Sequence, residues 1–269
     1  MAQIARQSKK VKTGSPVITE KVLKYLRTVL FVAVLIAVFY PPYLRGLYFE
    51  DEFLPAEIFV FAAFAVFWAY KIIRKDRRFL ETPIDYAAFG FVIVYFLSIF
   101  VSVGLRLAVT EWLKYCMYFA VFFMLSELAD TYKSRVTVLW VIVASAAGVA
   151  VLGVDGAAGG HVSSTLNSFF RLLGAQHDIF FGLFEGGRIH STIQYPNTLA
   201  AYLMAAFFIS QALAVVSARL WAKAAAGAAG FIMLVTFVFT LSRGAYLIMP
   251  IAAVLYLVAL PKGSRIDGA

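Results

Sequence analysis

Cysteine is nearly absent from this sequence, and its scarcity excludes several kinds of chemistry. The single cysteine, Cys116, lies inside an apolar run. One cysteine cannot form an internal disulfide, and the chain has no C-x-x-C pattern, so neither thiol redox chemistry nor a thiolate metal site is expected. We interpret Cys116 as a small buried side chain.

Charged residues are scarce as well. They make up 14% of the chain, whereas hydrophobic residues make up 62%, and the mean hydropathy is +0.83. This composition excludes a soluble globular domain and indicates a polytopic membrane protein. The net charge of +9 would suggest a nucleic-acid partner in a soluble protein. Here the basic residues lie in short segments between apolar runs, so no nucleic acid is expected.

Long apolar runs are abundant and predict an all-α fold, a polytopic transmembrane helical bundle of about eight spans. A helix needs about 20 residues to cross the hydrocarbon core. The expected spans are residues 24–44, 55–73, 84–103, 108–129, 136–154, 194–216, 224–241 and 245–260. Only Ser-Arg-Gly-Ala separates the last two, and we prefer two spans to one broken helix because an arginine at mid-depth is costly.

The distribution of basic residues predicts the orientation. With a cytoplasmic N-terminus, 18 of the 24 Lys and Arg residues fall in inner segments and 5 in outer segments, which agrees with the positive-inside rule. Residues 1–20 are expected to form a basic, disordered cytoplasmic tail. The transmembrane domain then covers 21–260, and 261–269 form a short C-terminal tail. No cleavage site follows the first span, so we expect a retained anchor.

The longest expected loop is outer, at 155–193. It opens with a Gly-rich stretch at 155–160, and 166–187 have the Phe and Leu spacing of a helix that lies on the membrane surface. Gly186 and Gly187 then suggest a flexible joint before Arg188.

Arg188 lies just outside the sixth apolar run. An interfacial arginine that snorkels to lipid headgroups is one reading. The other is an anion site, because many hydrogen-bonding side chains follow within ten residues: His190, Ser191, Thr192, Gln194, Tyr195 and Asn197. Pro196 suits the first turn of a helix, which would put Asn197 near the positive helix end.

Arg243 lies between the last two apolar runs. Ser242, Arg243 and Gly244 could form only a tight outer turn, with Gly244 supplying backbone freedom. A turn does not need arginine, however, and the topology puts Arg243 on the same side as Arg188. Two such cations favour an anionic ligand such as a phosphate.

Together the two stretches resemble the bacterial O-antigen ligase/O-antigen polymerase family of membrane glycosyltransferases. The resemblance is carried by Arg-x-x-Ser-x-x-x-x-Pro-Asn-x-x-Ala at 188–200 and Ser-Arg-Gly-Ala at 242–245. It implies a multi-pass enzyme of the bacterial cytoplasmic membrane. Such an enzyme transfers a glycan from a polyprenyl-diphosphate lipid to a glycan or lipid acceptor at the outer face, and it uses no cofactor, metal or nucleotide-sugar.

The resemblance also implies residue roles. Arg188 and Arg243 would be the catalytic pair that holds the donor diphosphate. The candidates for binding the substrate are His190, Ser191, Tyr195, Asn197, Ser242 and Lys114. Family members usually continue with a large outer loop whose histidine activates the acceptor, whereas His161, His177 and His190 precede the second motif. The chain is therefore expected to be an N-terminal part, a truncated frame, or one half of a split enzyme with a separate C-terminal half.

Other polar residues allow further readings. Glu111 and Lys114 are spaced to pair on one helix, although Lys114 could instead be a third cation for the diphosphate. Glu50, Asp51, Glu52 and Glu57 are expected to form a solvated acidic outer loop. The neighbours His177 and Asp178 point apart on a helix and are not expected to form a catalytic dyad. Two alternative functions stay open: a transporter or flippase for a lipid-linked or anionic substrate, and a truncated, non-catalytic membrane protein.

Overall fold

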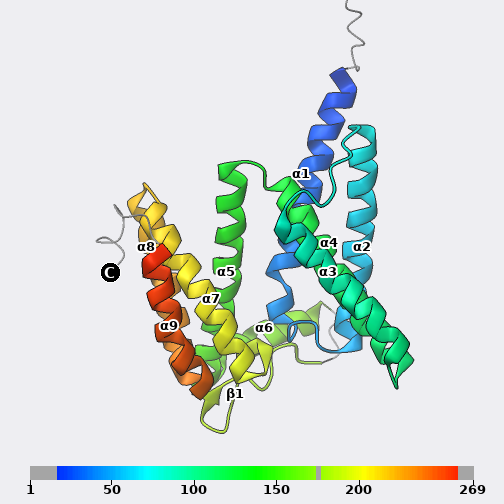
Figure 1. Cartoon of the computed structure of the whole chain (residues 1–269). Helices are drawn as coiled ribbons and strands as arrows, with labels where there is room; N and C mark the ends of the chain where they lie inside the picture. The colour runs from blue at the N-terminus through cyan, green and yellow to red at the C-terminus, as the bar shows by residue number, and fades with distance from the viewer. Residues whose placement is uncertain (1–16, 174–176, 260–269) are drawn as a thin grey trace, which may run out of the picture.

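The computed structural model describes residues 17–173 and 177–259, and these residues are mostly helical (Figure 1). The helices are α1 (Val17–Phe39), α2 (Glu50–Ile73), α3 (Pro83–Ser98), α4 (Leu105–Leu128), α5 (Tyr132–Ala157), α6 (His161–Leu172), α7 (Pro196–Val216), α8 (Leu220–Phe239) and α9 (Arg243–Ala259). Short elements are the turns η1 (Pro41–Tyr43), η2 (Ile99–Val101) and η3 (Ser191–Ile193) and the strands β1 (Phe184–Glu185) and β2 (Arg188–Ile189).

The number of spans agrees with the hydropathy pattern. Within the described residues, seven helices are long and apolar enough to cross a membrane, and α6 is not among them. The eighth expected span is α9, whose 17 residues reach about 26 Å. The prediction of an all-α, polytopic bundle is thus confirmed, and α8 and α9 are two helices and not one broken span.

Two helix starts differ most from the expected boundaries, those of α1 and α2. α1 begins at Val17, inside the tail expected at 1–20, and residues 1–16 and 261–269 lie outside the described residues. The prediction of an acidic loop at Glu50–Glu57 is wrong, because α2 begins at Glu50 and includes it. Carboxylates in the first turn of a helix are favoured by the helix dipole, which explains the earlier start.

The helices run between two ends of the bundle. Figure 1 shows α6 lying across one end, together with η1, the β1–β2 hairpin and the starts of α7 and α9; we name this the outer end. The opposite, inner end carries the start of α1 and the connections α2–α3, α4–α5 and α7–α8. Arg188 and Arg243 therefore share the outer end, as the sequence predicts.

The bundle has two packing groups. Helices α1–α4 surround an aromatic cluster in which Phe67, Trp68, Phe79 and Phe123 contact one another. Helices α5, α7, α8 and α9 form the second group, in which α7 and α8 pack most extensively. The close approach of α8 to α7 depends on Gly230, because a side-chain carbon at that position would lie 2.8 Å from the Ser210 hydroxyl.

Ser145 of α5 joins the two groups. Its hydroxyl donates to the carbonyl of Phe39 at 2.6 Å, and that carbonyl lacks a helical partner because α1 stops at Pro41-Pro42. The same hydroxyl accepts from the Tyr202 hydroxyl of α7 at 3.1 Å. A polar group buried at membrane depth must be satisfied internally, so this residue ties three helices together.

The orientation can be tested by labelling. In a Cys116→Ala background, Glu185→Cys places a thiol at the outer end and Tyr132→Cys places one at the inner end, both at exposed positions. Because the inner end carries most basic residues, a membrane-impermeant maleimide added to intact cells is expected to label Glu185→Cys, and to label Tyr132→Cys only after lysis. The reverse pattern would contradict the assigned orientation.

Candidate functional site

A two-stranded hairpin presents Arg188 at the outer end. Phe184 pairs with Ile189 and Glu185 pairs with Arg188, so the turn consists of Gly186 and Gly187. Both glycines have positive φ, +56° and +75°, which glycine adopts without strain. The expected flexible joint is thus a tight turn that fixes Arg188 in a strand.

The residues after Arg188 are anchored to α5. Ile189 is buried, and a side-chain carbon added at Gly153 would lie 2.7 Å from its Cγ2 atom, so only glycine allows this contact. Ser191 is fully buried, and its hydroxyl donates to the carbonyl of Val149 at 2.6 Å. The backbone on the C-terminal side of Arg188 therefore sits on a rigid support.

The segment before the hairpin is held by α6. The side-chain amide of Asn167 donates to the carbonyl of Phe180 at 2.7 Å and accepts from the N–H of Phe180 at 2.9 Å. The carboxylate of Asp155 accepts from the N–H groups of Val162 and Ser163, both at 2.8 Å, and so caps α6 from the end of α5. α6 replaces the longer surface helix expected at 166–187, and it ends at Leu172.

Arg188 joins the two sequence motifs. Its Nε donates to the carbonyl of Thr240 at 2.8 Å, and Thr240 stands just after α8, three residues before Arg243. Within the described residues, the two terminal guanidinium nitrogens make no hydrogen bond or ion pair. Arg188 is half-buried, so one edge of its guanidinium is fixed and the other edge is free to bind an anion.

The turn between α8 and α9 positions Arg243. Leu241 supplies the turn with a φ of +51°, so the expectation that Gly244 provides the backbone freedom is wrong, and Gly244 lies inside α9. Arg243 is the first residue of α9 and is exposed. Its guanidinium makes no hydrogen bond or ion pair in the part of the chain that the structure describes. A second uncompensated cation thus follows, three residues along the chain, the carbonyl that holds Arg188.

Two helix N-termini add positive potential at the same end. Pro196 is the first residue of α7, as predicted, and α7 packs against α9. Asn197 follows in the first turn and is exposed. The first N–H groups of a helix lack internal partners and carry partial positive charge, so both helix starts favour an anion here.

The other candidates from the two motifs divide into two classes. His190 is half-buried beside Arg188, and Tyr195 is exposed at the start of α7, so both remain candidates for contact with a ligand. Ser191 has already used its hydroxyl on the backbone, as described above, which gives it a structural role. Ser242 is buried in the turn before Arg243, and its carbonyl accepts from the N–H of Tyr246 at 3.0 Å.

Lys114 lies in the other packing group. It pairs with Glu111 at 2.9 Å, as its spacing predicts, and lies over the ring of Phe53 at 4.5 Å. The structure does not bring Lys114 to the two arginines, because α4 packs against α1, α2 and α3. Near it on α2, Glu57 is 4% exposed and its Oε1 has no hydrogen-bond partner. No sequence signal distinguishes the buried Glu52 and Glu57 from the exposed Glu50 and Asp51.

Two half-open cavities lie elsewhere in the described residues, and neither is lined by Arg188 or Arg243. One, of about 690 Å³, is at the outer end between α1, α2 and residues 177–181. The other, of about 530 Å³, is at the inner end and surrounds the buried Lys71. Within residues 17–173 and 177–259, no three His, Cys, Asp or Glu side chains gather in a way that could hold a metal ion.

The inner cavity is built from mutually paired charges. Lys71 is 1% exposed and binds Glu127 at 3.0 Å, while Arg78 binds Asp76 at 3.1 Å. The hydrogen bond from Arg78 is the main reason why the pKa of Asp76 falls to about 2. These ion pairs join the inner ends of α2 and α4, and we assign them to stability.

Comparisons with protein-family models, with curated proteins and with solved structures find no match to this chain.

Proposed function

We propose that this chain is the donor-binding part of a membrane glycosyltransferase of the O-antigen ligase/polymerase type. It would act on a polyprenyl-diphosphate-linked glycan at the outer face of the bacterial cytoplasmic membrane. The observation that carries the proposal is the bond from Arg188 Nε to the Thr240 carbonyl. That bond puts two cations with free nitrogens, from motifs far apart in the sequence, at one end of the bundle.

In the proposed reaction the two arginines stabilise the leaving group, which is the donor diphosphate. The acceptor hydroxyl oxygen forms a bond to the anomeric carbon, and the bond from that carbon to the diphosphate oxygen breaks. The diphosphate leaves with the electron pair, so negative charge grows on it in the transition state. Two guanidinium groups fixed against its oxygens favour that charge. The proton of the hydroxyl goes to a base that we do not assign to a residue of this chain.

A carrier of lipid-linked or anionic substrates is the second candidate. The buried Glu57, near Lys114 inside the membrane-spanning part, is the observation that favours it, since ionisable residues at such depth often mark transport pathways. Many secondary transporters also have helices that break near mid-membrane. In the described residues, α1–α5 and α7–α9 each run without an unwound segment.

Reconstitution separates the two functions. Membrane vesicles from cells that make the chain, supplied with a labelled polyprenyl-diphosphate oligosaccharide, are expected to release polyprenyl diphosphate when an acceptor glycan is added, because such vesicles keep a second protein that carries the base. Thin-layer chromatography of the lipid fraction measures the release, and vesicles from cells that make the Arg188→Ala variant give the background. Movement of the intact lipid across the bilayer without cleavage would contradict the transferase and favour the carrier.

A further inference from the structure

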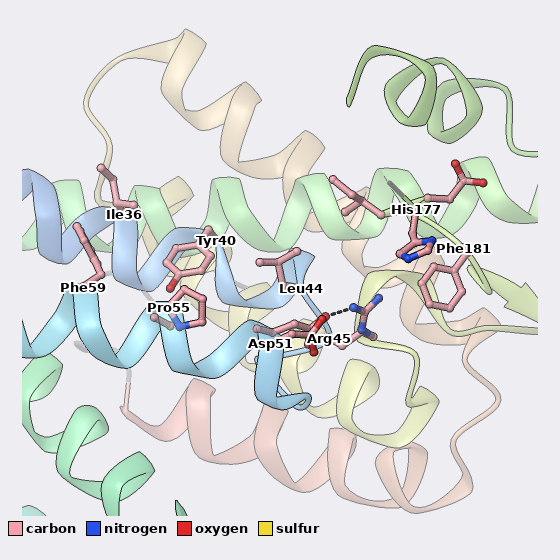
Figure 2. A pocket seen from close by; sticks show the side chains of 13 residues that line it. Ile36, Tyr40, Leu44, Arg45, Asp51, Pro55, Phe59, His177 and Phe181 are labelled. Carbon is pink, nitrogen blue, oxygen red and sulfur yellow. Dashed lines mark hydrogen bonds and ion pairs between the residues drawn. The ribbon is translucent and has the colours of Figure 1, made fainter. Parts of the chain in front are cut away.

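The outer cavity is lined by neither Arg188 nor Arg243. It is formed by the end of α1, the start of α2 and residues 177–181, and its volume of about 690 Å³ is in the range of small-ligand sites. Figure 2 shows its lining side chains arranged in a row along α1 and α2. No part of the proposed donor chemistry uses this cavity.

The lining changes from apolar to polar along that row. Ile36 on α1 is followed toward the outer end by Tyr40 and Leu44, which flank the turn η1. Phe59 and Pro55 accompany them on α2 (Figure 2). The apolar end is accessible from the side, because Ile36 is 49% exposed and Phe59 is 38% exposed. The cavity thus has the polarity of a lipid that stands upright in a membrane, with its chain inward and its headgroup outward.

Charges at the polar end are largely compensated. Arg45 forms an ion pair with Glu52, and its guanidinium lies over the ring of Phe181 at 5.2 Å. Asp178 pairs with Arg171 at 2.9 Å. Asp51 makes no ion pair or hydrogen bond in the described part of the chain. The polar end therefore has no spare cation for a phosphate and has one spare carboxylate.

Two further groups at this end are suited to hydroxyls. The Nε of Arg45 is buried without a hydrogen-bond partner, so one donor is unused. His177 lines the same end and adds a ring with both donor and acceptor capacity (Figure 2). A sugar presents hydroxyl groups that donate and accept hydrogen bonds, and also apolar ring faces. The Asp51 carboxylate, the Arg45 donor and the Phe181 ring suit these three features.

We propose that this cavity binds a glycolipid, with its apolar chain between Ile36 and Phe59 and its uncharged, hydroxyl-rich headgroup at Arg45, Asp51 and His177. The proposal goes beyond the donor site and stands without it. If the chain is a transferase, this second site has the chemistry of a lipid acceptor.

Photo-crosslinking in vesicles tests the proposal. The full chain is placed in phosphatidylcholine vesicles with a monoglucosyl diacylglycerol that carries a diazirine in its acyl chain, and the labelled peptides are identified by mass spectrometry. Labelling is expected within residues 36–59, about tenfold stronger than with the same diazirine chain on phosphatidylglycerol, because the spare carboxylate disfavours a phosphate. Unlabelled glucosyl diacylglycerol should compete, whereas free glucose should not.

Variants give the matched controls. Ile36→Trp fills the apolar end at a half-exposed position and should abolish the labelling, while Ile58→Trp, 71% exposed and outside the lining, should leave it unchanged. Asp51→Asn should reduce the preference for the glycolipid over phosphatidylglycerol. Equal labelling by the two lipids, competition by free glucose, or full labelling of Ile36→Trp would each overturn the proposal.

Discussion

Replacing Arg188 with alanine is expected to weaken binding of polyprenyl diphosphate by roughly 100-fold or more. A hydrogen bond to a charged group contributes about 1.5–3 kcal/mol, and the two free guanidinium nitrogens of Arg188 can make two of them to phosphate oxygens. A loss of about 3 kcal/mol corresponds to roughly 100-fold in the dissociation constant. Tryptophan fluorescence or microscale thermophoresis of the purified chain with a short-chain polyprenyl diphosphate measures the change.

Lysine substitutions should separate the two arginines. Arg188 uses Nε on the Thr240 carbonyl while its other two nitrogens stay free, and a single ammonium group cannot reproduce that division. Arg188→Lys is therefore expected to lose most of the affinity lost by Arg188→Ala. Arg243 is exposed and holds no partner in the described residues, so Arg243→Lys should retain more affinity than Arg188→Lys.

A double-mutant cycle tests whether the two arginines share one ligand. If both bind the same diphosphate, the losses in Arg188→Ala and Arg243→Ala should not add in the double variant. Arg106→Ala is the matched control, because Arg106 is an exposed outer-end arginine that pairs with Glu50 at 2.8 Å. Strictly additive losses, or an equal loss in Arg106→Ala, would show that the effect is a general one of outer charge.

The helices of this protein could be predicted from the sequence because membrane spans depend on a property of single segments. About 20 apolar residues must cross the core wherever their neighbours lie, so hydropathy placed eight spans near their observed positions. The ends were harder to predict, because they depend on local backbone choices. The left-handed Leu241 and the early start at Glu50 are examples, since neither residue is a typical signal for a turn or a helix start.

The site itself could be predicted only in part. The Lys and Arg distribution was enough to put Arg188 and Arg243 at one end. The bond from Arg188 to the Thr240 carbonyl depends on how β2 lies against the end of α8, and the support under β2 depends on Gly153 and Ser191. These are tertiary contacts between segments far apart in the sequence, and a single sequence does not contain them.

Burial of charges was the property least visible in the sequence. Lys71 counted as one of the basic residues of an inner segment, yet it is 1% exposed and touches three aromatic rings: Phe67, Trp68 and Phe123. Its four-carbon stem lets a residue near the membrane surface place its ammonium group inside the bundle. Only the fold shows that the group meets a carboxylate there.

Replacing Lys71 with alanine is expected to destabilise the protein by about 3–5 kcal/mol, because it leaves Glu127 without its closest cation and opens a cavity. Among the described residues, Glu127 then keeps only the more distant Arg78, at 3.8 Å. A loss of this size is a large part of the total stability of a typical domain, about 5–15 kcal/mol. Unfolding in mixed dodecylmaltoside and SDS micelles measures the change.

The deciding comparison is between replacing one partner of the Lys71–Glu127 ion pair and replacing both partners. Replacing Lys71 and Glu127 together, as Lys71→Met with Glu127→Leu, removes both buried charges and should recover most of the lost stability. Arg106→Ala breaks the exposed pair with Glu50, whose side chains are 81% and 59% exposed, and should change stability by less than about 1 kcal/mol. Equal destabilisation by Lys71→Ala and Arg106→Ala would contradict the assignment of the Lys71 network to stability.

Because Lys71 lies at the inner end, the folded fraction of Lys71→Ala should still bind polyprenyl diphosphate with unchanged affinity. That result would separate the Lys71 network from the arginine pair at the other end of the bundle.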